Sequence, residues 1–296
     1  MIRTALLFFF SVSILSYRGN AQNSNAKFNS VLWEVSSDTT RSAYLFGTMH
    51  LMREDAFFFP KKIKKLLLKS DVLVMELNSE IFDPSIIDLM LLEEGELFDF
   101  FSDEQQDSIL HFAIDNLSIS EQLFHANFSK IKPVVISQMF AMISNSKEDS
   151  TAQNIKSHEA ELNLLAKMDS IPIIGFETAK EQITLFDDLP KEVQTEMVME
   201  QVRGVDNIGE FILLTELYKS QNVDSMYYFI HNSDSYFSDY EEEFLSKRNR
   251  SWIQKIKEIV SKQSAFIAVG AGHLGGPNGL IRLLQQEGYR VKPIQL

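Results

Sequence analysis

The hydrophobic and polar positions of the chain fall into two kinds of segment. Short apolar runs predict strands, and apolar residues spaced three or four apart among polar ones predict helices. Most of the runs are continuous rather than alternating, which is typical of strands buried on both faces of a parallel sheet. The predicted strands are Val31–Val35, Ala43–Phe46, Asp71–Leu77, Ile171–Gly175, Ala265–Gly270 and Tyr289–Ile294.

Strands that alternate with helices predict an α/β fold, with a largely parallel (mixed) sheet flanked by helices. The first two strands should form an antiparallel hairpin, because only a turn-like segment separates them. We assign residues 31–296 to this domain, with a helical insertion at residues 83–154. Inside the insertion, the segment Ser102–Gln105 has the capping-box sequence that opens a helix. Near the other end, Tyr240–Val260 is predicted to form one long helix, with Trp252 packed on the sheet.

Two segments repeat one plan of strand, Gly-x-x-His, loop, helix and strand. They span Tyr44–Leu77, with Gly47 and His50, and Ala265–Ile294, with Gly270 and His273. For 12 glycines and 6 histidines in 296 residues, random placement gives about 0.24 such pairs, so two are an excess. Because ligands gather at the carboxyl ends of parallel strands, we expect both histidines to meet there.

Glu76 interrupts the apolar run of the strand that follows the first histidine. A carboxylate in such a strand is costly unless it is paired, bound to a cation, or able to reach solvent. Two imidazoles and a carboxylate can hold a divalent ion such as Mn, Co or Zn, which activates water and polarises a carbonyl. The hypothesis is a metal site made by His50, His273 and Glu76, with Glu76 either a third ligand or the general base. Without a metal, both histidines would cap strand ends.

Other chemistries fit the sequence less well. A Gly-x-Ser-x-Gly elbow and a P-loop are both absent from the sequence. The segment from Gly270 to Gly275 matches the dinucleotide-binding pattern formally, but too little chain follows for the acid that binds the ribose. His158 lacks a second histidine four residues on and is expected to be an exposed first-turn residue. For Glu177, the alternative to a role in a site is a helix-start carboxylate favoured by the helix dipole.

The N-terminus predicts export. Arg3 precedes the apolar run Ala5–Leu15, and small residues up to Ala21 complete a signal peptide at residues 1–21, followed by a flexible lead-in at residues 22–30. The run is shorter than the ~20 residues that cross a bilayer, and no second run of that length follows. We therefore expect an exported protein, periplasmic or secreted, with no integral membrane segment in the mature chain.

The amino-acid composition excludes several kinds of site and argues against two kinds of partner. The chain has no cysteine, which excludes disulfides, iron–sulfur clusters and thiol nucleophiles. Its net charge is −13, and no cluster of lysine and arginine is interleaved with aromatic residues. Because nucleic acids and anionic membranes are bound first through positive charge, we expect neither as a partner.

Several of these segments together resemble the TraB/GumN family, which is related to the Tiki metalloproteases. The resemblance covers nearly all of residues 31–294. It is carried by Tyr44-Leu45-Phe46-Gly47-Thr48-Met49-His50, Val74-Met75-Glu76, Gly175-Phe176-Glu177-Thr178 with Glu181-Gln182, Arg248-Asn249 before Trp252, and Val269-Gly270-Ala271-Gly272-His273-Leu274-Gly275-Gly276.

The resemblance implies an EreA/ChaN-like α/β fold and, from the Tiki branch, a divalent-metal peptidase that uses the two histidines and a glutamate. It also implies that Arg248 and Asn249 lie beside the site, and we expect Glu177, Gly47 and Gly270 to line it. Two departures stand out. The chain has Glu159 where relatives tend to carry aspartate, and we expect no membrane anchor of the kind that Tiki proteins have.

The leading hypothesis is an exported metal-dependent hydrolase that acts on a peptide or protein substrate. The alternative is a protein of the same fold that binds or sequesters a peptide or signal without turnover. A third possibility is a role in handling haem or iron, as suggested for other proteins of this fold.

Overall fold

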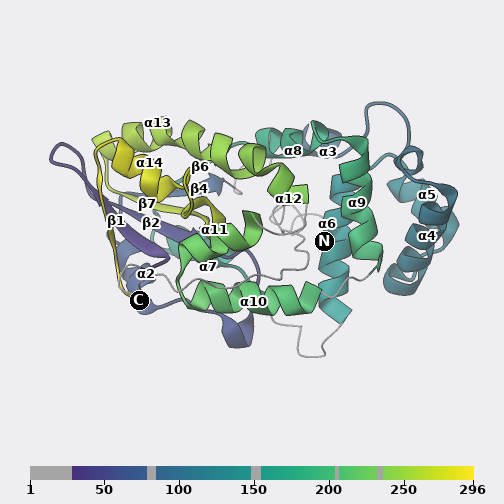
Figure 1. Cartoon of the computed structure of the whole chain (residues 1–296), viewed down its shortest axis with the longest axis horizontal. Coiled ribbons are helices and arrows are strands. Elements are labelled where there is room, and N and C mark those ends of the chain that lie inside the picture. The colour runs from purple at the N-terminus through teal and green to yellow at the C-terminus, as the bar shows by residue number, and fades with distance from the viewer. Residues whose placement is uncertain (1–28, 79–84, 148–154, 204–206, 232–235) are drawn as a thin grey trace. The chain divides into compact units, whose positions relative to one another are not determined.

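The computed structural model describes residues 29–78, 85–147, 155–203, 207–231 and 236–296 (Figure 1). The expected signal peptide, and all but the last two residues of the lead-in, lie outside these ranges. The described residues divide into two compact units. A sheet unit contains residues 29–78, 155–177, 208–231 and 236–296, and a helical unit contains residues 85–147 and 178–203.

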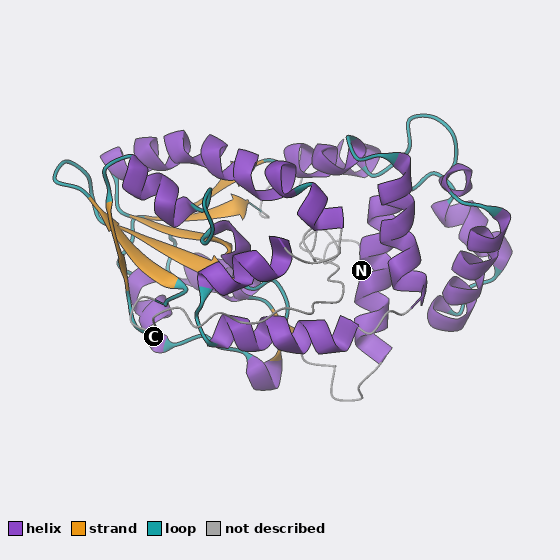
Figure 2. Ribbon diagram, viewed as in Figure 1, coloured by secondary structure: helices purple, strands orange, loops and turns teal. Residues whose placement is uncertain are grey.

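The sheet, drawn in orange in Figure 2, has six strands in the order β6-β4-β7-β2-β1-β8. β1 is antiparallel to both its neighbours, whereas β2, β4, β6 and β7 pair in parallel, which confirms the predicted mixed, largely parallel sheet and the first hairpin. The strands are β1 (Leu32–Ser36), β2 (Ala43–Thr48), β4 (Val72–Leu77), β6 (Ile173–Glu177), β7 (Ala265–Gly270) and β8 (Arg290–Pro293). A separate two-stranded sheet pairs β3 (Met52–Arg53) with β5 (Ile155–Lys156).

The most apolar runs form the middle of the sheet. β7 lies between β4 and β2, and its first five residues are buried. Thr48 pairs with Gly270, and Met75 pairs with Ala268, so the carboxyl ends of three strands lie side by side. The two segments that carry Gly-x-x-His are thus direct neighbours, although more than 200 residues separate them in the sequence.

Helices cover both faces of the sheet. α2 (Lys61–Leu67) packs beside α7 (His158–Met168), and α13 (Lys247–Lys262) packs beside α14 (Leu280–Gln286) on the other face (Figure 1). Right-handed crossovers explain this division, because the chain moves across the sheet in opposite directions after β2 and after β7. The unit also contains α10 (Asn207–Lys219) from its second residue onwards, α11 (Val223–His231) and α12 (Tyr236–Asp239).

The predicted long helix at Tyr240–Val260 is helical without a break from Glu241 onwards, but it is not α-helical throughout. A π-helical turn, η4 (Glu242–Ser246), precedes α13, and Trp252 of α13 is fully buried as expected. The extra residue per turn of a π-helix shifts the register of the side chains. The spacing of hydrophobic residues in the sequence does not distinguish a π-helical turn from an α-helical one, because apolar residues still recur every three to five positions in both.

The helical unit contains α3 (Ser85–Leu89), η3 (Leu97–Phe100), α4 (Asp103–Leu117), α5 (Glu121–Phe128), α6 (Pro133–Lys147), α8 (Ala179–Asp187) and α9 (Lys191–Arg203). The capping box before α4 has both of its hydrogen bonds: the Ser102 hydroxyl accepts from the Gln105 backbone N–H, and the Gln105 side chain accepts from the Ser102 backbone N–H. The apolar core of the helical unit includes Phe124, Phe140 and Val198. Among the described residues of both units, no helix has the length and apolar character needed to cross a membrane.

Candidate functional site

The two Gly-x-x-His histidines and Glu76 converge at the carboxyl ends of β2, β4 and β7. A methyl group placed on Gly270 would lie 3.2 Å from Glu76 Oε1, 3.5 Å from His50 Nε2 and 3.7 Å from His273 Cδ2. One point in space is therefore within contact distance of all three side chains. A larger residue at Gly270 would occupy the space that they share. Gly47 is also crowded, because a methyl group there would lie 3.1 Å from Ala271.

Glu76 is only 8% exposed and has several polar neighbours. Its Oε1 accepts from the Gly270 N–H at 2.7 Å, and its Oε2 accepts from Arg248 Nη2 at 2.6 Å. Burial alone would raise the pKa of Glu76, but His273, Arg248 and His50 outweigh burial and lower it to about 2. The carboxylate therefore stays ionised at neutral pH, as the buried charge in a strand requires.

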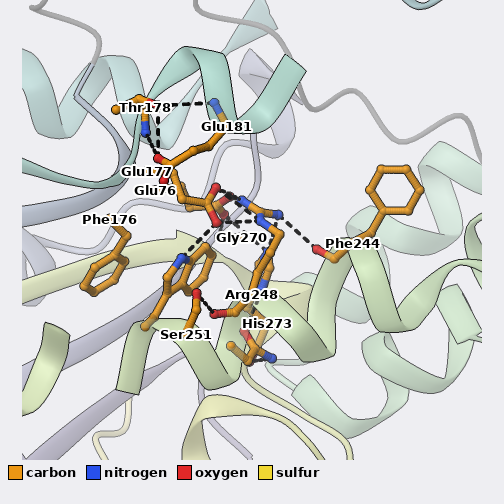
Figure 3. A network of polar contacts seen from close by, with 12 residues as sticks. Glu76, Phe176, Glu177, Thr178, Glu181, Phe244, Arg248, Ser251, Gly270 and His273 are labelled. Atoms are coloured by element: carbon orange, nitrogen blue, oxygen red, sulfur yellow. Dashed lines mark hydrogen bonds and ion pairs between the residues drawn. The ribbon is translucent and has the colours of Figure 1, made fainter. Parts of the chain in front are cut away.

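Arg248 is the centre of this network (Figure 3). The side chain is 4% exposed, and its guanidinium donates to Glu76 and to both oxygens of Glu177, with Nε 2.9 Å from Oε1 and Nη2 2.8 Å from Oε2. Nη1 donates to the Phe244 carbonyl at 3.0 Å, inside the π-helical turn. Trp252, four residues after Arg248, donates from Nε1 to Glu177 Oε1 at 2.9 Å.

The structure does not support the alternative interpretation of Glu177, as a helix-start carboxylate. Glu177 is the last residue of β6, and Thr178 caps α8 instead. The carboxylate of Glu177 is bonded to a guanidinium and an indole, so specific partners rather than a helix dipole stabilise it. Glu177 thus bonds the same arginine as Glu76.

His273 is held in one tautomer. Asn249 Nδ2 donates to the carbonyls of His273 and Asn278, so Asn249 Oδ1 is the acceptor, and His273 Nδ1–H donates to it at 2.7 Å. This leaves the lone pair on Nε2, which lies 3.2 Å from Arg248 Nη1 and 3.7 Å from Glu76 Oε1. Burial, together with the positive charges of Arg248 and His50, lowers the pKa of His273 to about 3 against the attraction of Glu76. His273 is therefore neutral at physiological pH.

His50 is oriented in the same way by a different group. Its Nδ1 lies 2.8 Å from Glu159 Oε1, and its side chain is 29% exposed. Burial would lower the pKa of His50, but Glu159 raises it to about 9, with a smaller contribution from Glu76. Both histidines thus have Nδ1 held by an acceptor on a helix, and Nε2 is the nitrogen on the other side of the ring. Metal-binding histidines are commonly held by such outer contacts.

His158 is not the exposed first-turn residue that the sequence predicts. The ring is fully buried, Nδ1 accepts from the Met49 N–H at 3.1 Å, and Nε2–H donates to the Phe58 carbonyl at 3.0 Å. Tyr218 adds a bond from its hydroxyl to the Gly47 carbonyl at 2.8 Å. His158 and Tyr218 therefore fix the backbone of the turn that carries the first histidine.

Sequence reasoning missed the roles of His158, Glu159, Tyr218 and Trp252. For Trp252 a signal was present, because residues four apart on a helix share a face, and Arg248 precedes it by four. For Glu159 the signal was its position, at the start of the helix where relatives tend to carry aspartate. No local pattern indicates that Tyr218 reaches Gly47, because 171 residues separate them.

The donor types at this site suit a divalent ion, since two imidazoles and a carboxylate form a common ligand set. The outer contacts of both histidines fit that role as well. In the arrangement described, however, Arg248 donates to Glu76 and lies beside His273 Nε2, and no group of three acidic or histidine residues in the described part of the chain is spaced to hold a metal. Coordination by Glu76 and His273 therefore competes with Arg248.

Comparison with known proteins gives one match. The model of the TraB/PrgY/gumN family matches residues 31–293, which include every element of the sheet. No curated protein and no solved structure matches the chain.

Proposed function

Because the chain belongs to the TraB/PrgY/gumN family, we propose that it is an exported metal-dependent hydrolase of peptide bonds, with its site at the carboxyl ends of β2, β4 and β7. His50 and His273 would hold the ion, and Glu76 would serve as a third ligand or as the general base. The observation that carries the proposal is the matched pair of histidines, each with Nδ1 held by an acceptor and both within contact distance of one point at Gly270.

A divalent ion bound here would lower the pKa of a water molecule and polarise a substrate carbonyl. The residues of the chain have complementary tasks. Glu76, ionised because its pKa is lowered to about 2, can accept a proton or coordinate the ion. His273 is neutral and offers a lone pair, whereas His50, whose pKa is raised to about 9, must give up a proton before it coordinates. Arg248 supplies positive charge that can stabilise a negatively charged carbonyl oxygen.

Metal analysis of the purified chain tests the site. After loading with manganese, cobalt or zinc and removal of free ion, we expect bound metal in the wild type and its loss in His50→Ala and His273→Ala. His125→Ala, a change at an exposed histidine of α5, is the control and should retain metal. Equal occupancy in all four proteins would refute the metal site.

Cleavage of a peptide library, with and without a chelator, tests the activity. We expect cleavage that the chelator abolishes and that restored metal recovers. No cleavage with any of the three metals, although the metal is bound, would refute the peptidase.

A second candidate function is binding of a peptide or signal without turnover. It is supported by the contact of Arg248 with Glu76, which occupies the carboxylate that a hydrolase would use. Retention of library peptides without cleavage, under every metal tested, would favour this function over the first.

A further inference from the structure

Helix α2 carries a concentration of positive charge in an acidic protein. Five of the 28 lysine and arginine residues fall between Lys61 and Lys69, whereas the net charge of the chain is −13. On the buried side of the helix, Ile63 and Leu67 pack into the main core. The lysines are exposed to solvent. This helix lies beside the C-terminal end of the chain, where Lys62 donates to the Gln295 carbonyl (Figure 1).

The lysines form one wall of a groove of about 520 Å³. Helix α2 contributes three lysines and one leucine, the turn after it contributes Lys69, and strand β2, strand β1 and the C-terminal segment contribute the other lining residues. These residues are Lys61, Lys62, Lys65, Leu66, Lys69, Tyr44, Glu34 and Ile294. Four cations against one carboxylate make the groove positive, and the aromatic and aliphatic side chains give it an apolar surface.

Among the described residues, three of the four lysines that line the groove form no ion pair, and the fourth, Lys62, donates to the Gln295 carbonyl. Elsewhere in the described part of the chain, lysines pair with carboxylates, for example Lys257 with Glu287 and Lys156 with Glu54. No described carboxylate pairs with Lys61, Lys65 or Lys69. Placing like charges close together without counter-charges is unfavourable, so an anionic ligand would relieve their repulsion.

The spacing of the lysines indicates the form of the ligand. Lys61 and Lys65 are one helical turn apart, about 6 Å along the axis at 1.5 Å per residue. Every second side chain of an extended peptide is separated by about 6.8 Å and lies on one side of it. Carboxylates at alternate positions of an extended peptide therefore match successive lysines, and the intervening side chains can face the apolar part of the groove.

We propose that this groove binds an extended acidic segment of a polypeptide, with Asp or Glu at alternate positions along α2 and apolar residues against Tyr44, Leu66 and Ile294. A short segment confined to the groove interacts mainly with the lysines that line it, because salt screens surface charges that are more than about 8–10 Å away at physiological ionic strength. A membrane surface or a long nucleic acid extends over many of the acidic residues and is repelled by them. The proposal does not depend on metal binding or catalysis.

Fluorescence anisotropy of a labelled peptide of alternating Glu and Val, with a neutral dye, tests the proposal on the purified full chain. We expect saturable binding that weakens as salt rises, and no binding of the matching Gln–Val peptide. The triple variant Lys61→Gln/Lys65→Gln/Lys69→Gln should bind at least about tenfold more weakly. Lys180→Gln/Lys219→Gln/Lys262→Gln makes the same change in net charge at exposed lysines on other helices and should bind as the wild type does.

Circular dichroism confirms that both triple variants are folded before binding is compared. Three outcomes would overturn the proposal: no saturable binding of the Glu–Val peptide, equal binding of the Gln–Val peptide, or an equal loss of binding in both triple variants. Tighter binding to phosphatidylglycerol vesicles than to the peptide, lost in the α2 variant, would also overturn it and assign the groove to a membrane. The same assay on His50→Ala/His273→Ala, without metal, keeps this result separate from the proposed hydrolase.

Discussion

Replacing Arg248 by methionine should destabilise the sheet unit strongly. The change keeps an unbranched side chain of similar length but removes the guanidinium that bonds Glu76, both oxygens of Glu177 and the Phe244 carbonyl. Both carboxylates have side chains only 9% exposed, so neither can recover its bonds with bulk water. Removal of one partner from a buried ion pair typically costs about 3–5 kcal/mol. We expect a loss within that range.

Urea unfolding followed by tryptophan fluorescence measures the effect directly. The two tryptophans of the chain, Trp33 and Trp252, are both buried in the sheet unit, so their fluorescence reports on that unit. Arg250→Met is a matched control two residues further along α13, where Arg250 pairs with Glu242 and both side chains are about half exposed. An exposed pair of this kind contributes about 0–1 kcal/mol.

The effect of Arg248→Met should also depend on pH. In the wild type, the lowered pKa of Glu76 contributes stability that is present above its usual pKa near 4.5 and is lost as the pH falls towards 2. In the variant, His273 and His50 still oppose burial but the charge of Arg248 is lost, so the pKa of Glu76 is higher than in the wild type; the ionised carboxylate is less favourable at pH 7 and protonation relieves it. The difference from wild type should therefore be largest near pH 7 and smaller near pH 5. Equal losses for both arginine variants, or a difference that grows on acidification, would refute the reasoning.

Three further predictions concern other contacts of the sheet unit. Replacing His158 by alanine should cost about 1–3 kcal/mol in urea unfolding, because the buried backbone groups that it bonds lose their partner; a loss below 0.5 kcal/mol would contradict this. Replacing Glu159 by glutamine should lower the pKa of His50 from about 9 towards its usual 6.5. A raised histidine pKa stabilises the folded state at low pH, so the extra stability of the wild type over the variant should shrink as the pH rises from 6.5 to 9. NMR titration of the imidazole measures the pKa, and an unchanged value would refute the assignment. Replacing Gly275 by alanine should cost about 2–3 kcal/mol, because the new methyl group would lie 2.3 Å from the Val223 carbonyl oxygen; urea unfolding measures it, and a neutral result would show that the loop moves freely.

The sequence was sufficient to predict the sheet and the meeting of its key residues. Continuous apolar runs indicate buried parallel strands, and parallel strands place their carboxyl ends on one edge. That rule brings His50, Glu76 and His273 together without any knowledge of strand order. The order itself, with β7 between β2 and β4, could not be predicted, because apolar strands of similar length do not differ in the neighbours they accept.

The supporting groups could not be predicted from local pattern. His158 resembles an exposed first-turn residue until the backbone of Met49, 109 residues earlier, is seen to donate to it. Arg248 was placed beside the site only by family resemblance, and its two carboxylate partners come from β4 and β6. Buried polar residues depend on partners that are distant in sequence, so hydrophobic periodicity carries no information about them.

The central position of β7 has a consequence for biosynthesis. β2 and β4 are made early, but neither pairs with the other, and the strand that joins them is made only when most of the chain exists. Until then, two apolar strands have unsatisfied edges that can pair with other chains. A nascent chain that stops before Ala265 cannot close its sheet, so the facing edges of β2 and β4 stay open to other chains until β7 has been made.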